Sequence, residues 1–288
     1  MSSNEENYFL SLKMNQSSTL AALYNEDDDG KFIFVYQMIS GVSFLKHKIR
    51  MDRKCDNFSF LPSAYGSTLA VLCCGSLRLY DLSINSSDSI DIITDYKTVE
   101  LKYSSDSAKC FKVGCYPPNL YFGYIQDGFL HIYLLDISNN HYESLPFRRY
   151  ILDNEPFIWY GFADKDVLYT ATDRYLRKTS LTQSVFFGDE ECVELNDEFI
   201  DADISSTNQN MLCLLFKRNE NTECALISFD GGSNQLYYLS DEDAIDEPSP
   251  KSIQWSTFST NIIINGKKTH VLHKNVASDK WEILEKEF

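Results

Sequence analysis

The sequence predicts an all-β fold built from a repeated unit of four antiparallel strands, and three observations lead to this prediction. Apolar, β-prone runs start at residues 19, 68, 119, 166, 210 and 261, so they recur 49, 51, 47, 44 and 51 residues apart. Each is followed closely by a second such run across a short turn. No long stretch has the 3.6-residue period of an amphipathic helix.

The paired runs are predicted to form a β-hairpin at the centre of each unit. The turns between them contain Asp-Asp-Asp-Gly, Gln-Asp-Gly or Asn-Gly, which are residues that tight hairpins favour. Tyr and Phe number 18 and 19, and both favour a pleated, half-buried surface. The first members of the pairs are 19–24, 68–74, 119–125, 166–172, 210–216 and 261–265, and the second members are 31–39, 76–84, 129–137, 174–181, 223–229 and 267–273.

A further strand candidate stands on each side of every pair. The preceding candidates are 8–14, 58–63, 110–115, 157–162, 199–204 and 253–258, and the following ones are 42–49, 89–94, 141–145, 184–188, 235–240 and 280–285. Four-stranded units at this period predict a six-bladed β-propeller that occupies residues 1–288 as one domain. Its blades are expected at about 7–50, 57–95, 108–146, 156–188, 198–240 and 252–286. A seven-bladed ring and an all-β sandwich or barrel are the alternatives.

The stretch 58–84, FSFLPSAYGSTLAVLCCGSLRLYDLSI, resembles a WD40 repeat. Its Phe-Leu-Pro-Ser at 60–63 is similar to the turn after the innermost strand, and Tyr80-Asp81 stands where the family has Trp-Asp. Leu-Asp at 135–136 and Phe-Asp at 229–230 occupy the same place in the third and fifth units. The chain departs from the family in lacking any Gly-His pair. The resemblance implies a propeller of the WD40-like superfamily, which fits a protein that holds partner proteins.

The net charge of −16 favours some classes of binding partner over others. Nucleic-acid binding draws much of its affinity from cationic neutralisation of phosphates, so direct binding of DNA or RNA is not expected from the whole-chain charge. Basic partners, such as histone or ribosomal-protein tails, fit this charge better. The alternative is that the charge only keeps the protein soluble.

The cysteines and the termini indicate a reducing compartment. Eight cysteines form no Cys-x-x-Cys pair, so a zinc site is not expected. Cys73, Cys213 and Cys224 fall inside apolar runs, where a free cysteine behaves as a small hydrophobic residue. The first residues, MSSNEENYF, do not resemble a signal peptide, and no apolar run is long enough to span a membrane. We therefore expect a cytoplasmic or nuclear protein.

The search for catalytic chemistry is mostly negative. The chain has no Gly-x-Ser-x-Gly, P-loop, Gly-x-Gly-x-x-Gly or His-Glu-x-x-His sequence, and its five histidines are scattered. Asp201 and Asp203 are the sharpest carboxylate pair, because residues i and i+2 share one face of a strand. They are candidates to bind a cation from a propeller channel; the simpler interpretation is that they lie at a solvated strand edge.

Charged segments are the remaining candidate sites for binding protein. The alternatives are that Lys46 and Lys48 protect a strand edge from aggregation and that the acidic loops are solvated or disordered. One cationic stretch leaves the first unit and a short one leaves the third; acidic loops lie in the first hairpin and between the fifth and sixth units. Trp159, Tyr160 and Trp255 are candidate peptide anchors, although core packing is the favoured interpretation. The candidate protein-binding residues are Lys46, Lys48, Arg50, Arg53, Lys54, Arg148, Arg149, Asp27, Asp28, Asp29, Asp241 and Asp243.

These patterns favour a non-catalytic scaffold or adaptor subunit of a larger eukaryotic complex. No cofactor, metal or small-molecule substrate is expected. One alternative is an acidic chaperone for a basic protein, such as a histone or ribosomal protein. A different class is a propeller enzyme with channel-lining carboxylates and a metal, and a third is an RNA-binding protein that uses the stretch 46–54.

Overall fold

A computed structural model describes most of the strands and the turns that join them. The described residues are 11–15, 17, 19–27, 30–40, 42–61, 67–73, 75–83, 90–100, 108–116, 119–135, 144–150, 155–163, 167–180, 191–205, 207–208, 210–218, 221–229, 236–238, 252–256, 261–265, 269–274 and 281–284. Two compact units, Met1–Tyr150 and Ile151–Phe288, contain three β-sheets each.

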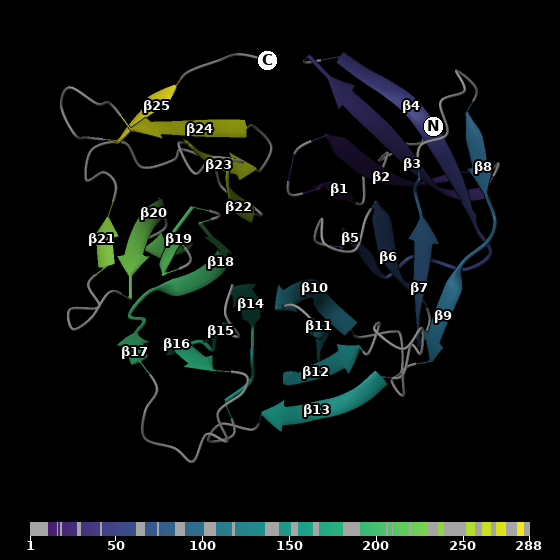
Figure 1. Ribbon diagram of the computed structural model, residues 1–288. Helices are drawn as coiled ribbons and strands as arrows, with labels where there is room; N and C mark the ends of the chain where they lie inside the picture. Colours follow the sequence, from purple (N-terminus) through teal and green to yellow (C-terminus); the bar gives the residue numbers. More distant parts are fainter. Residues whose placement is uncertain are drawn as a thin grey trace, which may run out of the picture. The chain divides into compact units, whose positions relative to one another are not determined.

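The first unit begins with a five-stranded sheet in the order β1-β2-β3-β4-β8 (Figure 1). Its strands are β1 (Ser11–Met14), β2 (Leu20–Asp27), β3 (Gly30–Ile39), β4 (Val42–Met51) and β8 (Asp91–Ile93). The second sheet contains β5 (Asn57–Phe60), β6 (Thr68–Cys73), β7 (Ser76–Asp81) and β9 (Lys97–Glu100). The third contains β10 (Ala108–Tyr116), β11 (Asn119–Gln126), β12 (Phe129–Leu135) and β13 (Ser144–Tyr150).

The second unit contains three four-stranded antiparallel sheets whose strands pair in chain order. Its fourth sheet contains β14 (Trp159–Ala163), β15 (Val167–Ala171), β16 (Tyr175–Ser180) and β17 (Glu191–Glu194). The fifth contains β18 (Glu198–Ile204), β19 (Met211–Arg218), β20 (Asn221–Ser228) and β21 (Leu236–Tyr238). The sixth contains β22 (Ser252–Trp255), β23 (Asn261–Asn265), β24 (Thr269–Lys274) and β25 (Trp281–Leu284).

Within each unit, the middle sheet is buried on both faces. Along β6, Leu69 and Val71 join the core shared with the first sheet, whereas Ala70 and Leu72 join the core shared with the third. Strand β19 behaves in the same way: its even-numbered leucines pack toward the fourth sheet and its odd-numbered residues toward the sixth. A strand covered on both sides has no solvent face, and this explains why these runs are continuously apolar rather than alternating.

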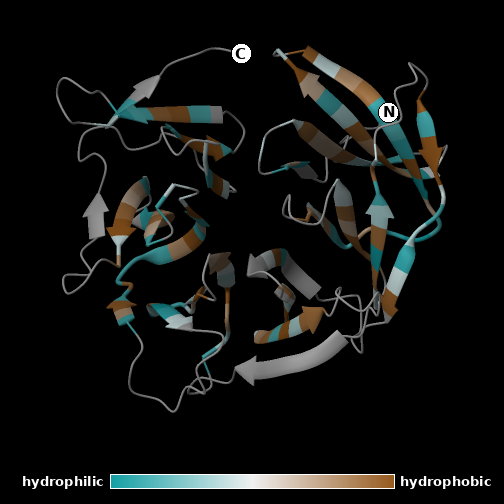
Figure 2. Ribbon diagram, viewed as in Figure 1, coloured by the Kyte–Doolittle hydropathy of each residue, from teal (hydrophilic) through white to brown (hydrophobic). Residues whose placement is uncertain are grey.

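The first sheet has the alternating pattern instead. Ile33 and Val35 on β3 and Ile49 on β4 are fully buried against the second sheet, while Phe34 and Tyr36 on the opposite face are only half-buried. Figure 2 shows the corresponding brown and teal bands along β3 and β4. One face of this sheet therefore belongs to the core that it shares with the second sheet, and the other face carries polar and aromatic side chains.

The hairpins that were predicted at the centre of each four-stranded repeat are confirmed as the two central strands of the corresponding sheets. The turn between β11 and β12 consists of Asp127 and Gly128, with φ angles of 51° and 78°. Two consecutive positive φ angles are the requirement of a tight two-residue hairpin, and Asp-Gly meets it at low steric cost. The prediction of an all-β fold is therefore correct, and the number of blades in a closed ring stays a prediction.

One strand was assigned to the wrong sheet by the sequence. The run 89–94 was expected to be the fourth strand of the second four-stranded repeat. Instead, β8 pairs in parallel with β4 of the first sheet, and β9 is the fourth strand of the second sheet. Parallel pairing joins distant segments and leaves no turn motif in the sequence. Strand β13 lies later than the expected 141–145, and the candidate at 184–188 lies outside the described residues.

Among the described side chains, five cysteines are free, and all of them except Cys192 are buried: Cys55, Cys73, Cys192, Cys213 and Cys224. Within the described ranges, no helical segment has the length and hydropathy that a membrane crossing requires.

Candidate protein-interaction surface

The predicted cationic stretch lies on β4 and in the turn that follows it. Lys46, Lys48 and Arg50 alternate along the strand with the buried residues His47, Ile49 and Met51. Lys46 is the extra residue of a bulge, because Val35 pairs with His47 and Tyr36 with Leu45. A bulge locally changes the direction of side chains. The alternation therefore directs these cations away from the core that the first and second sheets share.

Cross-strand pairing places aromatic rings beside these cations. Phe32 lies directly opposite Arg50, and Phe34 lies opposite Lys48. The Lys48 ammonium lies 3.9 Å from the centre of the Phe32 ring and 5.5 Å from that of Phe34. Cation–π attraction orients the lysine over the rings while its charged end remains available to an acidic group.

Strand β8 extends this face to the edge of the sheet. Ile92 lies opposite Lys48, and Ile93 lies opposite Ile49 and packs against the core. Ile92 is 69% exposed, the highest value among the large hydrophobic residues that are described as exposed. We call the surface formed by Phe32, Phe34, Lys48, Arg50 and Ile92 the cationic face. Ile92 was not predicted as part of this face, because no local pattern indicates which strand β8 pairs with.

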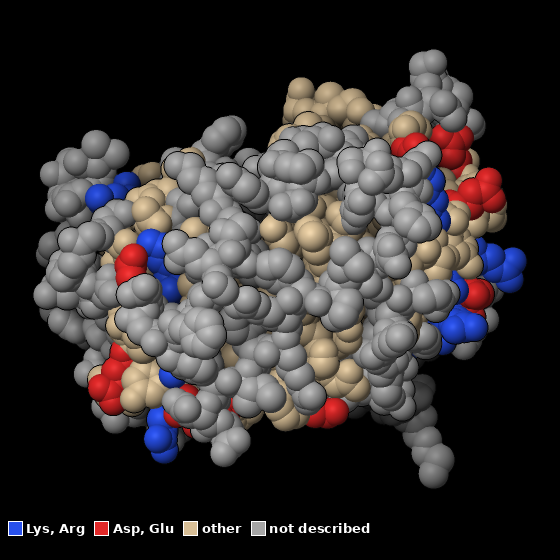
Figure 3. All heavy atoms as spheres, turned by 60° about the horizontal axis from the view of Figure 1, so that its bottom comes forward, with Lys and Arg blue, Asp and Glu red and all other residues tan. Residues whose placement is uncertain are grey.

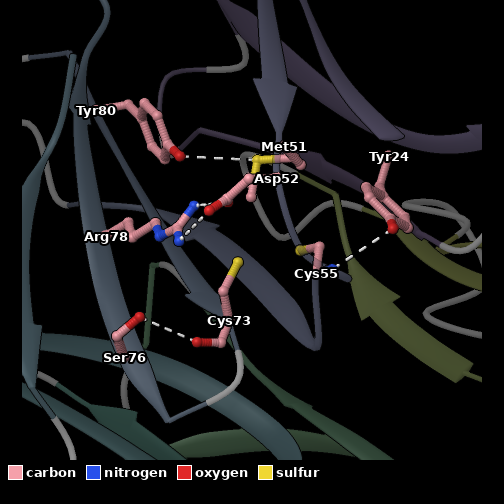
Figure 4. A network of polar contacts seen from close by, with 8 residues as sticks. All are labelled: Tyr24, Met51, Asp52, Cys55, Cys73, Ser76, Arg78 and Tyr80. Atoms are coloured by element: carbon pink, nitrogen blue, oxygen red, sulfur yellow. Dashed lines mark hydrogen bonds and ion pairs between the residues drawn. The ribbon is translucent and has the colours of Figure 1, made fainter. Parts of the chain in front are cut away.

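The turn after β4 is fixed by an ion pair with the second sheet (Figure 4). Arg78 on β7 is 5% exposed and donates to both carboxylate oxygens of Asp52, with a distance of 3.1 Å from Nη2 to Oδ2. The Tyr96 ring lies 4.5 Å from the guanidinium carbon. This bidentate hydrogen bonding lowers the pKa of the Asp52 carboxyl. Asp52 interrupts the cationic stretch in the sequence because it neutralises a buried arginine that sequence analysis did not single out.

Two tyrosines complete this network (Figure 4). The Cys55 backbone N–H lies 3.4 Å from the Tyr24 hydroxyl, and that hydroxyl donates to Glu26 at 3.1 Å. The Tyr80 hydroxyl contacts the Met51 sulfur at 3.7 Å, and burial raises the pKa of Tyr80 to about 12. Because both sheets contribute to these contacts, the turn that carries Arg53 and Lys54 is held in place.

His47 lies beneath the cationic face, at the junction of β4 and β8. It is 1% exposed, and its Nδ1 lies 3.8 Å from Oδ2 of Asp91. Burial lowers its pKa from 6.5; the Asp91 carboxylate opposes this shift and the neighbouring Lys46 adds to it. The imidazole is therefore neutral in the folded protein around neutral pH.

This lowered pKa predicts a pH-dependent stability. Below pH 6.5 the unfolded chain protonates His47 while the folded protein does not, so the free energy of unfolding falls as pH falls toward the lowered pKa. The limiting slope for one such group is about 1.4 kcal/mol per pH unit. Urea unfolding at a series of pH values from neutral to mildly acidic should show a smaller loss for His47→Gln than for the parent. Identical pH profiles would contradict this role.

Six exposed apolar side chains lie on β3, β4 and β8 or in the segments next to β8. Ile39, Val42 and Phe44, at the tip of the β3–β4 hairpin, are 46–53% exposed. Ile90, Ile92 and Tyr96 are 42–69% exposed on and around β8. The other large hydrophobic residues found exposed in the described part are Met14 and Ile158. Exposed apolar side chains commonly mark a contact surface where they form a continuous patch.

The other predicted charged residues are not brought together with β4. Arg148 and Arg149 lie on β13, where they pair with Ile132 and His131, and their side chains are outside the description. Asp27 ends β2, opposite Gly30. Asp28, Asp29, Asp241 and Asp243 lie outside the described residues, so the predicted acidic loops stay a prediction.

The Asp201–Asp203 pair has a structural role that neither interpretation of the sequence anticipated. Oδ2 of Asp201 accepts the backbone N–H of Ile253 at 3.0 Å, and Oδ2 of Asp203 accepts that of Trp255 at 2.8 Å. Both carboxylates of β18 thus satisfy donors on β22, the first strand of the next sheet. The two acceptors and the two donors have the same spacing, i and i+2, because N–H groups two residues apart on a strand point to the same side.

The predicted aromatic anchors belong to the core. Trp159, Tyr160 and Trp255 are 3%, 0% and 9% exposed. His131 stacks on Tyr124 with ring centres 4.9 Å apart, and Nδ1 of His273 lies 2.8 Å from Oδ1 of Asn261. Within the described ranges, no group of three or more His, Cys, Asp or Glu side chains is placed to hold a metal ion.

The surface drawn in Figure 3 has no broad field of one sign among its described residues. Blue Lys and Arg atoms and red Asp and Glu atoms lie in small mixed groups that tan surface separates.

β-Sheets of mainly antiparallel strands that follow one another along the chain define the class, which is the β-propeller fold. The WD40 domain of Toxoplasma gondii coronin superposes with a TM-score of 0.65 at 13% identity, covering 97% of this chain and 70% of that one. The β-propeller domain of Cps50 (Swd1) from Myceliophteria thermophila gives 0.58 at 11% identity, covering 90% and 81%.

Other similar structures are named as candidate enzymes. A Bacteroides fragilis protein named as a candidate 6-phosphogluconolactonase gives a TM-score of 0.62 at 10% identity, covering 95% of this chain and 82% of that one. No protein-family model and no curated protein matches the sequence. At these identities the similarity shows the fold alone, because one fold serves many functions.

Proposed function

We propose that this protein is a non-catalytic scaffold that holds partner proteins, and that the first sheet carries one of its contact surfaces. The observation that carries this proposal is the cationic face together with its surroundings. Lys48 and Arg50 are backed by aromatic rings, Ile92 is exposed beside them, and more exposed apolar residues lie at the ends of the same sheet. Exposed apolar groups surrounded by charges are typical of protein-contact surfaces.

The charge of this surface favours an acidic partner. Lys46, Lys48, Arg50, Arg53 and Lys54 form no ion pair in the described part of the chain. The expectation of a basic partner rested on the net charge of −16 and on acidic loops, most of whose residues lie outside that part. Membership in a larger eukaryotic complex, and a cytoplasmic or nuclear location, are parts of the same proposal.

A metal-dependent enzyme receives no support from the carboxylate pair on which that alternative depended. Asp201 and Asp203 already accept backbone hydrogen bonds across two sheets, and a bound cation would compete with those donors. The similarity to candidate 6-phosphogluconolactonases concerns the fold, and it brings no reacting group to this chain.

Affinity purification at moderate salt tests the scaffold proposal. The parent bait should bring down a stoichiometric set of proteins, and a bait with Lys48→Glu, Arg50→Glu and Arg53→Glu should lose at least one of them. Reversing close interfacial charges replaces attraction with repulsion and typically weakens binding by more than about tenfold. Co-purified proteins are identified by mass spectrometry and quantified against the bait.

The matched control reverses three exposed cations outside β4, Lys13→Glu on β1, Arg174→Glu in the bend before β16 and Lys274→Glu on β24, which gives the same change in net charge. This bait should keep its partners. Equal losses with both baits would indicate a general effect of charge. A parent bait that purifies alone at every salt concentration would sink the scaffold proposal.

A further inference from the structure

The edge of β8 is a backbone surface that the sheet leaves available. In the strand order β1-β2-β3-β4-β8, β8 is the last strand, and no other described strand pairs with its outer edge. It is three residues long and lies parallel to β4. A strand at the end of a sheet presents unpaired N–H and C=O groups on its outer side, which can pair with a strand from another chain.

The two sides of this edge differ in charge. On the core side, Asp91 lies beside His47, and Ile93 packs into the core. On the opposite side lies the cationic face, where Ile92 and Lys48 are directly opposed and Arg50 follows Lys48 by two residues. Every formal charge on the β3, β4 and β8 residues of this second side is positive.

We propose that β8 accepts an extended acidic segment of a partner protein, which adds one strand to the edge of the first sheet. Backbone hydrogen bonds to β8 supply affinity, and alternate side chains of the segment supply specificity. An apolar side chain beside Ile92 covers its exposed surface. On the added segment, carboxylates two residues before or after that apolar side chain lie on the same face and approach Lys48 and Arg50.

The spacing allows these contacts. An added strand lies about 5 Å from β8 and about 10 Å from β4, because neighbouring strands are separated by about 4.8 Å. A carboxylate on the added strand and a long cationic side chain on β4 can span two strand spacings. The exposed Arg50 side chain is the first candidate for this pairing, because the Lys48 ammonium lies over the Phe32 and Phe34 rings of β3, on the side of β4 away from β8.

This inference rests on the proposed scaffold function and names the partner chemistry for one of its surfaces. The probe is a synthetic peptide, TETVTETVT, in which Glu and Val alternate on one face. Its controls are a scrambled peptide, TTTTTEEVV, and a cationic analogue, TKTVTKTVT. Fluorescence anisotropy measures binding to the full chain, and hydrogen exchange measures protection of the amides of residues 91–93.

The alternating acidic peptide should bind more tightly than either control and should protect the β8 amides. Ile92→Lys, which places a charge on the edge, and Lys48→Glu with Arg50→Glu should each weaken binding by about tenfold or more. The matched control Ile158→Lys changes another exposed isoleucine, which is 37% exposed, and should bind as the parent does. Equal binding of all three peptides, no binding of any, or Ile92→Lys binding like the parent would overturn strand addition.

The two proposals fail differently. If Ile92→Lys keeps every partner in the affinity purification while the charge-reversed bait loses them, the scaffold stands and strand addition at β8 is wrong. If the parent bait captures nothing, the scaffold function fails, and the peptide titration still decides whether β8 can accept a strand.

Discussion

Asp52→Ala should destabilise the protein by about 2–3 kcal/mol, as measured by urea unfolding. Among the described residues, Asp52 provides the one carboxylate that forms an ion pair with Arg78, whose side chain is 6% exposed, and the substitution removes it. Breaking a fully buried pair costs more, about 3–5 kcal/mol. The lower value is expected here because the Asp52 side chain is 59% exposed, so water already screens the pair and can partly replace the lost carboxylate.

Arg78→Met provides the matched comparison because it removes the charge and retains apolar volume. Replacement of a buried ion by a well-packed apolar group is often close to neutral, so this variant should lose about 1 kcal/mol or less. In an Asp52→Ala, Arg78→Met double variant, the loss should resemble that of Arg78→Met alone. An Arg78→Met variant that is less stable than Asp52→Ala would contradict the view that the unpaired cation is the main cost.

The double substitution Asp201→Ala, Asp203→Ala should destabilise the second unit by about 2–4 kcal/mol. Each alanine leaves one backbone N–H of β22 without its acceptor, at Ile253 and Trp255. A partly buried donor without a partner costs about 1–3 kcal/mol. Faster hydrogen exchange at those two amides, together with a lower urea midpoint, should accompany the loss.

The matched control, Asp201→Asn with Asp203→Asn, keeps an acceptor oxygen at each position and removes the charge. It should retain most of the stability, since a neutral amide carbonyl can still accept the same N–H, although more weakly. A cation site would instead predict that both double variants lose ion binding, because both remove its charge. Parent-like unfolding of the Ala double variant would show that these hydrogen bonds contribute nothing measurable.

The two central strands of each sheet were predictable because the apolar runs and turn residues that indicate them are close together in the sequence. The run at 119–125, the Asp127-Gly128 turn and the run at 129–137 form β11, its turn and β12 nearly as expected. Turn chemistry fixes the register of a hairpin, so neighbouring residues contain the necessary information. The burial of Cys73, Cys213 and Cys224 followed from the same apolar runs.

Three assignments depended on contacts between distant residues. The run that became β8 has the composition of an outer strand for either of two sheets, and its choice depends on packing of Ile93 beside Ile49. Asp203 and its backbone partner are separated by 52 residues, and Arg78 and Asp52 by 26. No local pattern distinguishes such a carboxylate from one in solvent.

The sequence by itself determined the all-β class, the repeated hairpins and the cationic stretch on β4, because period-two alternation and turn residues act over a few positions. Only the tertiary structure decided which strand flanks β4 and which charges are neutralised by burial. It therefore decided that Lys48 and Arg50 share a face with Ile92 while Asp52 is paired with Arg78. The physical reason is that strand pairing and desolvation of charge depend on neighbours that only the folded chain brings together.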